Sequence, residues 1–138
     1  MGTAPQQFDW VKARAKCSLR KVFADLHLQV REDVRIANEL PENSQRKAPF
    51  EVVPNDGGDA FTVRREGTIR PTVTFRLESE CIIVDSDFNS SGWEFCVGLN
   101  DEGRCVLRDK EGEYEQWQVR RMTLEMLLFG PSRFQVST

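Results

Sequence analysis

The chain has 138 residues, of which 39% are hydrophobic and 30% are charged, which is typical of one globular domain with its own core. Its net charge is −3 and its pI is about 5.3, so the basic surface that nucleic-acid binding requires is not expected. The sequence contains no run of about 18 apolar residues, and we therefore expect no membrane-spanning helix.

The first seven residues, Met-Gly-Thr-Ala-Pro-Gln-Gln, lack the basic start and apolar stretch of a signal peptide. The predicted location is therefore the cytoplasm. The four cysteines have no CxxC spacing, and the chain has one histidine, so we expect no metal site. In a cytoplasmic protein these cysteines are interpreted as small, unpaired hydrophobic side chains.

Residues 5–40 carry the pattern of one long amphipathic helix, or of two helices joined by a bend. Apolar residues recur at spacings of three and four, and the alternating segment Leu26–Val30 is the expected place for a bend. Pro41 ends the helix, because a residue before proline is pushed out of the helical region. A straight helix of about 30 residues would span ~45 Å, beyond the roughly 37 Å diameter of such a domain. This length predicts that the helix packs against a second copy of the chain.

Residues 50–115 are predicted to form an antiparallel meander of five or six strands. Short runs of alternating apolar residues are separated by turn-forming segments such as Pro54–Asp59. Residues 113–115 are a candidate edge strand. The expected strands are 50–53, 60–65, 72–78, 81–85 and two within 93–109.

The hairpin at 93–109 has the clearest pattern in the sheet. Its first strand has apolar residues at every odd position from 93 to 99, and Asn100–Gly103 supplies the turn. This turn predicts that Leu99 faces Cys105 and that Val97 faces Leu107. Cys96 then points to the opposite face from Cys105, so no disulfide is expected between them.

Residues 116–129 return to a helical period, and Gly130–Pro131 ends this second helix. Residues 131–138 are expected to form a tail. The order of helix, strand meander and helix predicts one α+β domain over residues 1–138, with both helices on one face of a curved antiparallel sheet.

Charge is distributed unevenly along the chain. Residues 1–24 hold five basic residues against one acid, and residues 78–115 hold eleven acids against three basic residues. Such polarity can promote self-association or attract a charged partner, although two solvated faces are the commoner explanation.

No catalytic constellation is visible, and an enzymatic function is not the favoured interpretation. His27 is the only histidine, and no nucleophile or acid lies at a spacing that places it beside this side chain. The segment Asp85–Asn89 begins like a calcium loop, but the glycine comes two positions late and Cys96 stands where a glutamate is required. We therefore predict no metal and no cofactor.

The favoured hypothesis is a non-enzymatic, cytosolic protein-interaction domain that acts as a homodimer. Its candidate interface residues are Trp117, Arg20 and Arg31. A second hypothesis is a cavity between helix and sheet that holds a small ligand or substrate. A third is an acidic chaperone-like or immunity-like dimer that holds one specific partner. The candidate ligand-binding residues of the second hypothesis are Trp93, Phe95, Phe75, His27 and Asp85.

Overall fold

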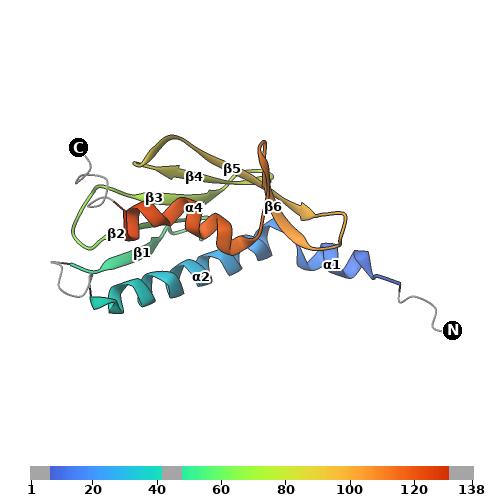
Figure 1. Ribbon diagram of the computed structural model, residues 1–138, viewed down its shortest axis with the longest axis horizontal. Helices are drawn as coiled ribbons and strands as arrows, with labels where there is room; N and C mark the ends of the chain where they lie inside the picture. Colours follow the sequence, from blue (N-terminus) through green and yellow to red (C-terminus); the bar gives the residue numbers. More distant parts are fainter. Residues whose placement is uncertain (1–6, 42–47, 131–138) are drawn as a thin grey trace.

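The structure is a computed structural model that describes residues 7–41 and 48–130. Seven antiparallel strands form one open sheet in chain order, and two helices cover one of its faces (Figure 1). The helices are α1 (Trp10–Lys16), α2 (Leu19–Glu39) and α4 (Gln116–Leu128), and the strands are β1 (Phe50–Pro54), β2 (Ala60–Arg65), β3 (Val73–Leu77), β4 (Cys81–Ser86), β5 (Asn89–Leu99), β6 (Cys105–Asp109) and β7 (Gly112–Tyr114).

The predicted α+β class is confirmed, and the sheet has seven strands where five or six were expected. The seventh strand is β7, which pairs with β6 through a tight turn and lies at the candidate edge strand 113–115. The Asp109 carboxylate holds this turn, because its Oδ1 accepts hydrogen bonds from the backbone N–H groups of Glu111 (2.8 Å) and Gly112 (3.0 Å).

The register of the β5–β6 hairpin agrees with the prediction. Leu99 lies opposite Cys105, and Val97 lies opposite Leu107. Asn100 fixes the turn, since its side-chain oxygen accepts hydrogen bonds from the backbone N–H groups of residues 102 and 104, each at 2.9 Å. Gly103 closes it with a φ of 81°, a conformation that glycine adopts without steric cost.

The core lies between the helices and the covered face of the sheet. Phe61 on β2 stacks on Phe75 on β3 with ring centroids 4.8 Å apart, and Phe23 on α2 lies 5.3 Å from Phe61. Successive side chains of a strand point to opposite faces of the sheet, so every second side chain of each strand faces the helices. The fully buried members of this set include Phe61, Val63, Val73, Phe75, Ile82, Val84 and Phe95.

The long N-terminal helix expected over residues 5–40 is two helices, and the predicted position of the bend was wrong. The break lies at Cys17–Ser18, where the Ser18 hydroxyl accepts a hydrogen bond from the Lys21 N–H (3.3 Å) and caps α2. Helix α2 continues without a bend through Leu26–Val30, because both end residues of that segment are anchored in the core at 0% exposure. At 21 residues α2 spans ~32 Å, so its length no longer requires a second copy.

A disulfide joins Cys17 to Cys105 with a Cα–Cα distance of 5.5 Å, and the prediction that all four cysteines are unpaired was wrong. The bond crosses 88 positions of sequence, so spacing could not reveal it. It ties the junction of α1 and α2 to the first residue of β6. The Phe8 ring also lies against the β5–β6 turn, since a Cβ added to Gly103 would meet its Cζ at 2.5 Å.

Helix α4 begins with a capping box. The Glu115 side chain accepts from the N–H of Gln118, and the Gln118 side chain accepts from the N–H of Glu115 (2.8 Å). The helix ends at Leu128, in agreement with the predicted range 116–129, whereas the predicted tail at 131–138 lies outside the described residues. No helix in the described part of the chain is long and apolar enough to cross a membrane.

Candidate functional site

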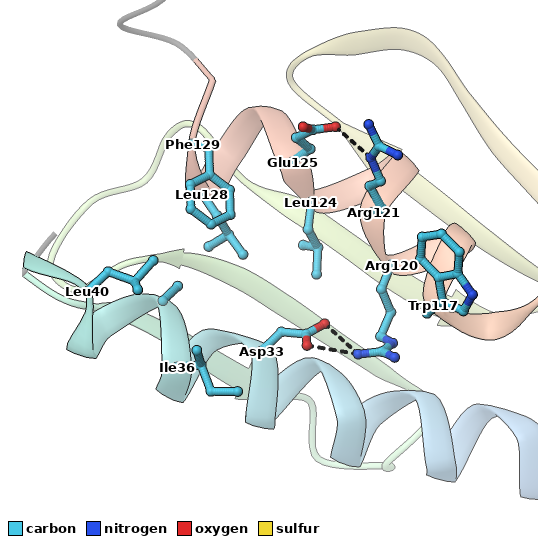
Figure 2. A pocket seen from close by; sticks show the side chains of 11 residues that line it. Asp33, Ile36, Leu40, Trp117, Arg120, Arg121, Leu124, Glu125, Leu128 and Phe129 are labelled. Carbon is cyan, nitrogen blue, oxygen red and sulfur yellow. Dashed lines mark hydrogen bonds and ion pairs between the residues drawn. The ribbon is translucent and has the colours of Figure 1, made fainter. Parts of the chain in front are cut away.

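Helices α2 and α4 run side by side in the same direction across the sheet (Figure 1). A groove of about 440 Å³ lies between them, and Figure 2 shows its lining side chains. We call this the α2–α4 groove. Its buried floor is Ala37, Leu124 and Leu128, and its exposed rim includes Ile36, Trp117 and Phe129.

Three large apolar side chains on the rim of the groove are exposed to solvent. Ile36 on α2 is 46% exposed, and Trp117 and Phe129 at the two ends of α4 are each 50% exposed. Figure 2 shows the isoleucine and the phenylalanine on opposite sides of the groove, with Leu124 and Leu128 between them. These exposed apolar side chains make the groove the candidate surface for binding another molecule.

Polar contacts hold the two helices together at the end of the groove nearest their N-termini. The Nη1 atom of Arg120 on α4 donates to both carboxylate oxygens of Asp33 on α2, each at 2.8 Å. One turn earlier on α4, Gln116 Nε2 donates to Asp25 Oδ2 at 2.8 Å. The Nε atom of Arg120 is buried without a hydrogen-bond partner, which makes the Asp33 carboxylate the main compensation for burying this guanidinium.

Charges of both signs flank the groove. On α4, the Arg121 Nε atom lies 3.2 Å from a carboxylate oxygen of Glu125. Outside the groove lining, Arg35 on α2 contacts Glu32 at 2.5 Å and Glu39 at 2.7 Å. The hydrogen bond from Arg35 holds the pKa of the Glu32 carboxyl below its usual value, so this ion pair persists at neutral pH.

The lining of the groove is mostly apolar, and its charged groups are paired with one another. The 11 side chains that line the groove include no histidine, cysteine or serine. Two of its four charged residues, Asp33 and Arg120, are engaged with each other, and so are Arg121 and Glu125. A general base or nucleophile would need a free titratable group beside a substrate-sized space, and the lining offers none.

The three predicted interface residues lie on different surfaces. Trp117 is on the rim of the groove. Arg20 and Arg31 are exposed on α2, but at ~100° per residue they project roughly opposite to Leu40, which lines the groove. Of the three predicted interface residues, Trp117 therefore lies at the groove, whereas the two arginines lie on another side of α2.

The predicted ligand-binding residues do not gather around one space. Phe75 and Phe95 are completely buried in the core, and Trp93 packs against it. Asp85 is on the opposite, open face of the sheet, where Arg76 Nε donates to it at 2.9 Å. A shared ligand site for these residues stays a prediction.

His27 lies on the flank of α2 away from the groove. Its ring stacks on Phe61 with centroids 4.3 Å apart and an interplanar angle of 8°, and its Nε2 atom is buried without a hydrogen-bond partner. Burial, and after it the positive charge of Arg31, lower the pKa of His27. The imidazole is therefore neutral at pH 7 and packs as an aromatic ring.

The segment that begins like a calcium loop is the hairpin between β4 and β5. Within it, Asp87 Oδ2 accepts a hydrogen bond from the Thr72 N–H at 2.8 Å, while Asp85 pairs with Arg76. No group of three or more histidine, cysteine or acidic side chains with metal-binding geometry occurs in residues 7–41 and 48–130.

Sequence reasoning missed most of the groove. Ile36 falls outside the apolar stripe of α2. An apolar residue at such a position predicts an exposed apolar side chain, and this signal could have identified Ile36 as a candidate binding residue. The pairing of Asp33 with Arg120 spans 87 positions and leaves no mark in either local sequence. Comparisons of the chain with protein-family models, with curated proteins and with solved structures find no match.

Proposed function

We propose that the protein is a non-enzymatic interaction domain that forms a homodimer through the α2–α4 groove. The observation that carries this proposal is the half-exposed apolar rim of Ile36, Trp117 and Phe129 above a buried apolar floor. Removing these side chains from water by pairing two copies is favourable by ~25 cal/mol for each Å² of apolar surface buried.

The charges around the groove favour a second copy of the same chain as the occupant. Arg121 and Glu125 on α4 line the groove together with the paired Asp33 on α2 and Arg120 on α4. In a twofold interface each residue meets the same surface turned around, so a rim that carries both signs complements itself. A rim of one sign would instead favour an oppositely charged partner.

The alternative of a ligand cavity between helix and sheet receives less support. Large side chains fill that space, and Leu26, Val30, Phe61 and Phe75 are each at most 1% exposed. Interior packing of this kind leaves no room for a small molecule without displacing the core. Binding at the external α2–α4 groove needs no such displacement.

The oligomeric state tests the proposal. Light scattering behind size-exclusion chromatography should give twice the monomer mass of 15.9 kDa at high protein concentration and a shift toward monomer on dilution. Replacing Ile36 with Glu should weaken association at least tenfold, because it places a charge in the apolar contact. A monomer at every concentration up to about 1 mM contradicts the homodimer.

Leu28→Glu is the matched control for Ile36→Glu. Leu28 is on the same helix and is 61% exposed, but it does not line the groove. The control protein should associate as the unmodified chain does. If the two variants weaken association equally, the contact is not the groove.

Cytoplasmic location stays a prediction from the sequence. The Cys17–Cys105 disulfide counts against it, because such bonds persist mainly in oxidising compartments. Cell fractionation combined with thiol trapping decides the question: cytoplasmic protein with this bond reduced supports the prediction, and oxidised protein in an exported fraction contradicts it.

A further inference from the structure

The open face of the sheet brings the remaining two cysteines together. Cys81 on β4 lies directly opposite Cys96 on β5, and their Sγ atoms are 2.7 Å apart. Both are free thiols, in contrast to the bonded pair of Cys17 and Cys105. Facing positions on adjacent antiparallel strands hold two side chains together whether or not a bond joins them.

The two thiols have different surroundings. Cys96 is exposed, and the next residue in its cross-strand row is Arg108 on β6, with which it lines the same surface hollow. A dissolved disulfide can reach an exposed thiol, which reacts with it in the thiolate form. Cys81 is partly covered, and burial, Cys96 and Glu94 together raise the pKa of its thiol to about 12.

We propose that Cys81 and Cys96 form a redox-active dithiol that undergoes thiol–disulfide exchange with a low-molecular-weight disulfide. This inference is independent of the α2–α4 groove, which lies on the other side of the sheet. Exposure makes Cys96 the attacking residue, and partial burial makes Cys81 the resolving one.

The exchange balances in two steps. The Cys96 thiolate attacks one sulfur of the disulfide RS–SR, forms a mixed disulfide with that sulfur and expels the other as RS⁻. Cys81 then gives its proton to solvent and attacks the Cys96 sulfur, which forms the Cys81–Cys96 bond and releases the second RS⁻. Overall the two protein thiols are oxidised, and one RS–SR is reduced to two RSH.

Glutathione redox buffers test the proposal on the full chain. After equilibration and alkylation of free thiols, a glutamate-specific protease would place the two residues on separate peptides, 81–94 and 95–102, because Glu80, Glu94 and Glu102 flank them. We expect these peptides to be linked in oxidising buffer and separate in reducing buffer. Failure to link at any ratio of oxidised to reduced glutathione would overturn the proposal.

Single variants test the roles of the two thiols. C81S should accumulate a glutathione adduct on Cys96, because the resolving thiol is missing. C96S should carry at least tenfold less adduct, since the partly buried Cys81 remains protonated. Equal adducts on both variants would contradict the assigned order of attack. The Cys17–Cys105 bond is the internal control, because its residues fall on two further peptides, 1–32 and 103–111.

Discussion

The two faces of the sheet are stabilised in different ways. On the helix-covered face, side chains such as Phe61, Phe75 and Phe95 are at most 1% exposed and pack within the hydrophobic core. On the open face, neighbouring strands are joined by polar pairs. These include the hydroxyls of Thr62 and Thr74 at 2.9 Å, Arg64 with Glu51 at 2.9 Å, Arg76 with Asp85 at 2.9 Å, and the thiols of Cys81 and Cys96.

The helix-covered face therefore supplies most of the stability of the fold, whereas the side chains of the open face are accessible for reaction. A buried apolar side chain leaves a cavity when it is shortened, and the surrounding structure fills that cavity only partly. When an exposed cross-strand polar pair is broken, water solvates the remaining polar group, and the loss of stability is small. We therefore expect substitutions on the covered face to affect stability, and substitutions on the open face to affect chemistry.

The largest expected effect is at the centre of the covered face. Phe75→Ala should lower the free energy of unfolding by about 3–5 kcal/mol, because the ring is fully buried against Phe61. The matched variant Thr74→Ala changes the adjacent residue on the open face and should cost about 1 kcal/mol through loss of one hydrogen bond. Urea unfolding followed by circular dichroism measures both. Equal losses would refute the division between the faces.

The two cysteine pairs give the next largest contrast. Replacing Cys17 and Cys105 together with Ala should lower the unfolding free energy by about 2–4 kcal/mol, because the bond closes a long loop of the unfolded chain. Replacing Cys81 and Cys96 together with Ser should change it by less than about 1 kcal/mol in reducing buffer, since no bond is lost. Denaturant unfolding of the four-cysteine protein in the same buffer provides the reference for each variant.

A smaller loss is expected at the ion pair that joins the two helices. Asp33→Ala should cost about 1–3 kcal/mol, because Arg120 is only 17% exposed and would lose its main partner. Glu125→Ala breaks the exposed Arg121–Glu125 pair on the same helix and should cost at most about 0.5 kcal/mol. Thermal unfolding of the two variants compares them directly, and a larger loss for Glu125→Ala would contradict the assignment.

The smallest effect concerns His27 at the edge of the covered face. Its pKa in the folded protein is below the unfolded value of about 6.5, so the unfolded chain binds the proton more readily. Its contribution to stability is complete above that pH and is lost as pH falls through the folded-state pKa. Melting temperatures from about pH 7.5 to 5.5 should decline less in His27→Phe, which keeps the stack on Phe61. An unchanged decline would show that other groups cause it.

Local pattern predicted the sheet well because each strand pairs with its neighbour in the chain. The alternation from Trp93 to Leu99 and the turn at Asn100–Gly103 together fix a register, and both signals lie within a few residues. The helix break was missed because the apolar stripe continues across it, from Ala15 to Leu19.

The groove and the disulfide could not be predicted in the same way. Cys17 meets Cys105, and Asp33 meets Arg120, only after the two ends of the sequence have folded onto the sheet. Neither contact has a local spacing that would reveal it. The facing thiols at Cys81 and Cys96 were within reach of sequence reasoning, because a register for β4 and β5 places them opposite each other.

The groove draws one wall from each end of the described chain, with the whole meander between them. A polypeptide made from its N-terminus emerges from the ribosome with α2 and the strands before α4 exists. The groove between α2 and α4 is thus completed only after α4 has been translated. A nascent chain that ends before α4 therefore carries only one of the two walls, whereas the association that we propose requires both.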